Sequence, residues 1–96
     1  MTNSYNDFKR YVRSHNLVNR IYDMLYYFKL IKKDNQSEKQ VKKFFSQRLE
    51  DVTYVETLAK YFESKLRKNK KNHEVRCNLL DLINDLNYLK QYLCDD

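Results

Sequence analysis

Apolar residues recur every three or four positions along most of the chain, which is the spacing of one buried face of an α-helix. In the first third, this pattern extends from Phe8 to Phe28 and predicts a long helix over residues 4–33. The polar run Ser14-His15-Asn16 interrupts the apolar face, so we expect a kink or a short break there. Residues 34–36 form the first predicted link.

The same spacing continues through residues 38–69, which could form one helix or two. An almost unbroken apolar phase favours one helix, whereas the capping-box pattern Thr53-Tyr54-Val55-Glu56 favours two. We expect two, and a similar pattern, Ser37-Glu38-Lys39-Gln40, is predicted to open the first of them.

The last predicted helix, residues 73–93, has the strongest periodicity. Its apolar residues are spaced as in a heptad repeat and form what we call the heptad stripe: Val75, Leu79, Leu82, Leu86, Leu89 and Leu93. Such a stripe packs either inside the chain's own helix bundle or against a second copy. We expect the core of the monomer, and a homodimer through this helix stays open as an alternative.

The chain contains no glycine and no proline. These residues supply positive φ angles, tight turns and helix stops, so hairpins and glycine-rich phosphate loops are difficult to build without them. With 96 residues, the chain is predicted to form a single domain over residues 1–96. Its predicted fold is all-α, an antiparallel bundle of three or four helices.

Composition indicates a small globular protein of the cytoplasm, with 42% hydrophobic and 33% charged residues. The longest apolar run, residues 24–28, is far too short to span a membrane, and the first residues lack a secretory signal pattern. Cys77 and Cys94 lie about 25 Å apart along the predicted helix, too far for a disulfide.

We expect no cofactor, no membrane contact and no small-molecule substrate. Many asparagines, lysines and tyrosines are typical of an AT-rich phage, plasmid or viral genome.

The net charge is +6, divided as +4 in residues 1–36, +5 in residues 37–73 and −3 in residues 74–96. A basic surface of this kind favours nucleic acid or an acidic protein as partner. The residues predicted to bind it are Lys29, Lys32, Lys33, Lys39, Lys42, Lys43, Lys65, Arg67, Lys68, Lys70 and Lys71. In a four-helix bundle they would gather at one end of the molecule, whereas a three-helix arrangement would divide them between two ends.

Aromatic residues are interleaved with some of these cations. Tyr22, Tyr26, Lys29 and Lys33 share one face of the first predicted helix. Such a surface can stack bases and contact phosphates, although tyrosines more often cover the edge of a small core. We prefer the second interpretation.

Two arginine–histidine pairs, Arg10 with His15 and Arg67 with His73, indicate an enzymatic alternative. Their spacing resembles that of HEPN ribonucleases, all-helical enzymes in which the cation steadies phosphate and the imidazole takes a proton. Tyr11 and Lys68 depart from that pattern, because an Asn or Asp commonly follows the arginine in that family.

The indication of a metal site is weaker still, and the sequence contains no serine-nucleophile motif. His73, Cys77 and Asp81 are spaced four residues apart on one helix face, but a fourth metal ligand is missing, so no metal is expected. No motif assigns the chain to a family. We therefore expect a non-enzymatic binding protein with a basic surface, and the alternative is a HEPN-like, metal-independent ribonuclease.

Overall fold

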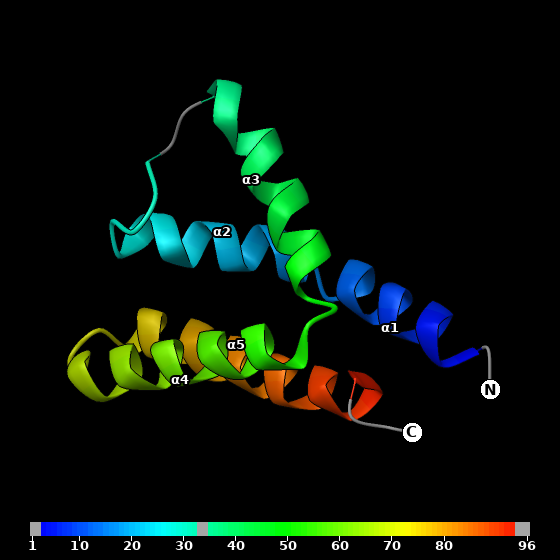
Figure 1. Ribbon diagram of the computed structural model, residues 1–96. Coiled ribbons are helices and arrows are strands. Elements are labelled where there is room, and N and C mark those ends of the chain that lie inside the picture. The colour runs from blue at the N-terminus through cyan, green and yellow to red at the C-terminus, as the bar shows by residue number, and fades with distance from the viewer. Residues whose placement is uncertain (1–2, 33–34, 94–96) are drawn as a thin grey trace.

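The structure, a computed structural model, describes residues 3–32 and 35–93. It is 84% helical and, within these residues, has no strands, so the predicted all-α fold class is confirmed. The helices are α1 (Asn3–Ser14), α2 (Leu17–Tyr27), α3 (Asn35–Arg48), α4 (Val52–Lys68) and α5 (His73–Leu93) (Figure 1). These five exceed the predicted three or four because the first predicted helix is divided.

The helices α4 and α5 form an antiparallel hairpin, which is the most extensive helix contact of the molecule (Figure 1). The helices α1 and α2 follow one another along this hairpin, and both pack on α5. The remaining helix, α3, packs on α2 and extends away from the hairpin. Each of α1, α2 and α4 therefore buries its apolar face against α5.

The expected break in the first helix is present, and an asparagine makes it. Helix α1 ends at Ser14 and α2 begins at Leu17, with Asn16 between them at φ 53° and ψ 40°. Asparagine enters this left-handed region more readily than most residues. The Asn16 side-chain oxygen accepts a hydrogen bond from the Asn19 side-chain nitrogen at 2.6 Å. Asn16 thus replaces the glycine that this chain lacks.

The end of α2, at Tyr27, comes well before the predicted end at residue 33. The N–H of Leu30 donates to the Leu25 carbonyl, and that of Lys29 donates to the Tyr26 carbonyl, both at 2.9 Å. This pattern is a Schellman motif, in which glycine usually takes the left-handed position. Here Lys29 takes it, at φ 64°.

Two helices cover the middle of the chain, as expected, but neither begins at its predicted capping box. Helix α3 begins at Asn35, so Ser37 lies inside it. Helix α4 begins at Val52, and its N-cap is Asp51 rather than Thr53. The Asp51 carboxylate accepts a hydrogen bond from the Thr53 N–H at 2.9 Å. Aspartate is among the best N-cap residues, which explains the earlier start.

The helix α5 has the predicted bounds, and its heptad stripe lies at the centre of the core. Leu79, Leu86 and Leu89 are fully buried, in one cluster with residues of α2 and α4 such as Ile21 and Phe62. The stripe therefore packs inside the chain's own bundle, as expected. A homodimer stays a prediction.

Replacing Leu86 with alanine should lower the free energy of unfolding by about 2–5 kcal/mol. The substitution removes apolar atoms from a closed core and leaves a cavity in their place. Urea denaturation followed by circular dichroism measures this change. The matched control is Leu80→Ala on the same helix, where the side chain is 50% exposed and the loss should stay within about 0.5 kcal/mol. Equal losses in both variants would contradict the assignment of the stripe to the core.

Replacing Lys29 with glycine should raise the free energy of unfolding by about 1 kcal/mol, since a side chain in the left-handed region costs about 1–2 kcal/mol. Lys32→Gly is the control, because it removes the same charge at a residue without positive φ. Thermal and urea unfolding should show a gain only at Lys29. A destabilised Lys29→Gly protein would show that the lysine contributes more than its backbone strain costs.

Candidate functional site

The carboxyl-terminal ends of α2 and α4 lie at the same end of the molecule, at the left of Figure 1. Phe28, directly after α2, meets Tyr61 of α4 edge-on with ring centres 6.4 Å apart. The ammonium group of Lys65 lies 5.1 Å from the centre of the Phe28 ring, within range of a cation–π interaction. We define the basic pole as the cations of this end: Lys29, Lys32, Lys65, Arg67, Lys68, Lys70 and Lys71. Lys33, also predicted to bind, lies outside the described residues.

Hydrogen bonds from α5 hold the link between α4 and α5. The Arg76 guanidinium donates to the Leu66 carbonyl at 2.8 Å and to the Asn69 carbonyl at 3.1 Å. The Asn69 side chain donates in turn to the Lys65 carbonyl at 2.8 Å. The Lys65 carbonyl also accepts the Asn69 N–H at 3.0 Å, and the bonds from Arg76 satisfy two further carbonyls at the end of α4. The backbone that carries the next lysines is therefore fixed.

The cations on and beside this link have no carboxylate partner. Arg67, Lys68, Lys70 and Lys71 are exposed, and within the described part of the chain none of them forms an ion pair. Arg67, Lys70 and Arg76 line a shallow surface hollow of about 560 Å³. The positive charge at this end is thus uncompensated and accessible to an anion.

The lysines of α3 do not join the basic pole, so the cations are divided and do not gather at one end as a four-helix bundle would place them. Helix α3 crosses α2, and its first turns stand apart from the link between α4 and α5 (Figure 1). Lys39 and Lys43 are exposed on it. The Lys42 ammonium forms an ion pair with Glu38 at 2.8 Å and lies 5.1 Å from the centre of the Tyr22 ring.

The tyrosines of α2 differ in exposure, which corrects part of the predicted aromatic face. Tyr22 is 1% exposed and belongs to the core, so it cannot stack on a ligand. Tyr26 and Tyr27 are exposed, and Tyr27 was not among the residues singled out from the sequence. Helical periodicity did not single it out, because Tyr27 lies off the face that Tyr22 and Tyr26 share in the predicted helix.

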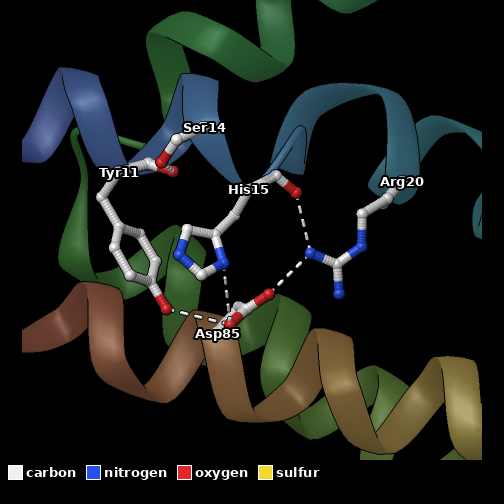
Figure 2. Close-up of polar contacts among 5 residues, drawn as sticks. All are labelled: Tyr11, Ser14, His15, Arg20 and Asp85. Atoms are coloured by element: carbon white, nitrogen blue, oxygen red, sulfur yellow. Dashed lines mark hydrogen bonds and ion pairs between the residues drawn. The ribbon is translucent and has the colours of Figure 1, made fainter.

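A second polar cluster joins α1, α2 and α5, and it too was missed from the sequence. Figure 2 shows Asp85 of α5 accepting hydrogen bonds from the Tyr11 hydroxyl at 2.9 Å and from Arg20 at 2.6 Å. The His15 Nδ1 atom lies 3.5 Å from the same carboxylate, and the His15 carbonyl accepts a bond from Arg20 at 2.8 Å. The imidazole stacks on the Tyr11 ring at 4.0 Å.

These contacts shift two pKa values. Burial alone would raise the pKa of Asp85, but the hydrogen bonds from Arg20 and Tyr11 and the positive charge of Arg20 outweigh it and hold the pKa below its usual value. Burial, together with the hydrogen bond to the carboxylate, raises the pKa of Tyr11 well above its usual range. The cluster therefore holds a charged aspartate that fastens the break between α1 and α2 to α5.

The two predicted arginine–histidine pairs have other neighbours. Arg10 forms an ion pair with Asp7 at 3.8 Å, and the cation beside His15 is Arg20. The Nε2 atom of His73 lies 3.7 Å from the Cys77 sulfur.

Next to the Asp85 cluster is a hollow of about 490 Å³, lined by His15, Arg20, Asp23, Met24, Asn78, Asp81, Leu82, Asn84 and Asp85.

Within the described residues, no group of three or more His, Cys, Asp or Glu side chains could hold a metal ion. No helix in that part of the chain is long and apolar enough to cross a membrane.

Comparison with known protein families, with curated proteins and with solved structures found no match to this chain.

Replacing Asp85 with asparagine should lower the free energy of unfolding by about 1.5–3 kcal/mol at neutral pH, the value of hydrogen bonds to a charged group. The side chain is 15% exposed, so water replaces these bonds poorly. Because the folded pKa lies below the unfolded one, this contribution is complete above about pH 4. It is lost as the pH falls through the folded pKa.

The measurement is urea denaturation of both proteins at pH 6 and pH 3, and their difference in stability should shrink at pH 3. Asp81→Asn is the matched control, because Asp81 is exposed, lines the same hollow and has no hydrogen bond or ion pair in the described structure. A difference that stays constant with pH would contradict the lowered pKa of Asp85.

Proposed function

We propose that this chain is a small non-enzymatic binding protein that binds a polyanionic macromolecule through the basic pole. The partner is nucleic acid or an acidic protein surface in the cytoplasm, and the protein is of the kind that phage, plasmid or viral genomes encode. The observation that supports this is the charge of Arg67 and Lys68 at the end of α4 and of Lys70 and Lys71 on the following link, which α5 holds in place; within the described residues none of the four forms an ion pair.

The helix dipole of α4 accounts for only part of this charge, because Arg67 and Lys68 lie in its last turn but Lys70 and Lys71 do not. Cations stabilise a helix end by about 0.3–1 kcal/mol each, and only within the last turn. Lys70 and Lys71 lie beyond the end of α4 at Lys68, so neither serves that purpose. Glu63 and Glu74, the nearest carboxylates in the sequence, form no ion pair with the link in the described structure.

The backbone at Lys29 adds to this argument. The lysine occupies a left-handed position that costs about 1–2 kcal/mol without glycine. Strain of this kind often marks a functional position. A Lys29→Gly protein is therefore expected to be more stable and yet to bind the polyanion less tightly.

The proposal is tested by the salt dependence of binding to a fluorescein-labelled DNA duplex, a labelled single strand and polyglutamate. Changing Lys68, Lys70 and Lys71 together to glutamine should flatten the slope of log affinity against log salt for either DNA by about two to three, since each phosphate contact contributes about 0.7–0.9. Polyglutamate binding by the wild type would indicate an acidic protein partner.

The control is the triple change of Lys9, Arg10 and Arg13 to glutamine, which removes the same charge from α1, at the other end of the molecule in Figure 1. Its salt slope should stay close to that of the wild type. Equal effects of the two triple variants would mean that binding follows net charge alone and not the basic pole.

The alternative, a HEPN-like ribonuclease, has one observation in its favour: the His15 imidazole lies 3.5 Å from the Asp85 carboxylate, which Arg20 also contacts, and both His15 and Arg20 line a hollow of about 490 Å³. Labelled RNA incubated with the protein in the presence of a chelator tests it. We expect no cleavage. Cleavage that disappears in His15→Asn, with the helix content unchanged, would favour the enzyme.

A further inference from the structure

A hollow of about 300 Å³ lies between the end of α2 and the start of α5, beside the basic pole. Tyr27 lines it on α2 together with Asp23 and Met24, and Tyr27 is 50% exposed. Phe28 packs edge-on against the Tyr27 ring with centres 5.1 Å apart, which limits the movement of that ring. The hollow therefore presents a supported aromatic surface to solvent.

The other lining residues indicate what can enter. Asn72 and Asn78 bring carboxamide groups, which donate and accept hydrogen bonds. Asp23 and Glu74 bring carboxylates, which repel a phosphate but accept hydrogen bonds from the amino groups of bases. A flat, neutral group with polar edges thus fits this hollow better than an anion does.

The cations that would contact phosphates are close in the sequence to residues that line the hollow. Lys29 follows Tyr27 by two residues, and Lys70 and Lys71 directly precede Asn72. A base beside Tyr27 would therefore leave its neighbouring phosphates near positive charge. Stacking aromatic rings together with a cationic track is how proteins bind single strands without strict sequence preference.

We infer that the basic pole binds single-stranded nucleic acid and that one unpaired base lies against Tyr27 in this hollow. The inference rests on the proposed function and narrows its partner. A duplex is disfavoured because its bases are already stacked and paired, so none is free to lie on a protein ring.

The first test measures affinities for a labelled twelve-nucleotide single strand, as DNA and as RNA, and for the DNA duplex of the same sequence. Tyr27→Ala should weaken single-strand binding by roughly 5- to 150-fold, as the loss of one base stack does, and should change duplex binding little. Tyr27→Phe should keep the affinity. The matched control is Tyr5→Ala, because Tyr5 is equally exposed but lies on α1. The DNA and RNA arms show which sugar is preferred.

The second test uses the absence of tryptophan from the chain. Tyr27→Trp places a single indole in the hollow, and its fluorescence should be quenched when a base of the single strand stacks on it. Heparin, a polyanion without bases, should bind without comparable quenching. Tyr5→Trp is the control and should respond to neither ligand.

The outcomes separate this inference from the proposed function. If the Lys68, Lys70 and Lys71 variant loses binding while Tyr27→Ala does not, the polyanion site stands and the base site is overturned. Equal quenching of Tyr27→Trp by heparin and by the single strand would also overturn it. If neither change affects binding, both proposals fail.

Discussion

The burial of the α5 heptad stripe is the interaction on which the rest of the structure depends. Leu79, Leu86 and Leu89 are fully buried, and α1, α2 and α4 all pack on this helix. Since α4 runs antiparallel to α5 and α2 lies along the same hairpin, the ends of α2 and α4 meet at one end of the molecule (Figure 1). Hydrophobic packing at the centre thus decides which cations become neighbours at the surface.

The chain makes its turns with polar side chains in place of glycine. Asn16 adopts the left-handed conformation between α1 and α2, and Lys29 adopts it after α2. Asp51 caps α4, while Asn72 accepts a hydrogen bond from the Val75 N–H at 3.2 Å at the start of α5. Each solution places a polar or charged group at a helix end. Lys29 in particular joins backbone strain to the charge of the basic pole.

The two polar clusters of the molecule have opposite characters. Around Asp85, the carboxylate is surrounded by Tyr11, His15 and Arg20, so the charges compensate one another and fasten separate helices together (Figure 2). At the basic pole, Arg76 donates its hydrogen bonds to backbone carbonyls, and the cations on the link stay uncompensated. The first arrangement is typical of a structural joint, and the second is the one suited to an external anion.

Local pattern in the sequence determined the helices, their approximate positions and the buried side of α5, because helical periodicity and residue propensity act over a few neighbouring positions. Residues 73–93 and the break near Asn16 were predictable for this reason. Only the tertiary structure decided that α3 crosses α2, that Tyr22 is buried and that Tyr27 and Asn72 line one hollow. Asp85 likewise meets residues more than sixty positions away, and no local pattern encodes such a contact, since it depends on how whole helices pack.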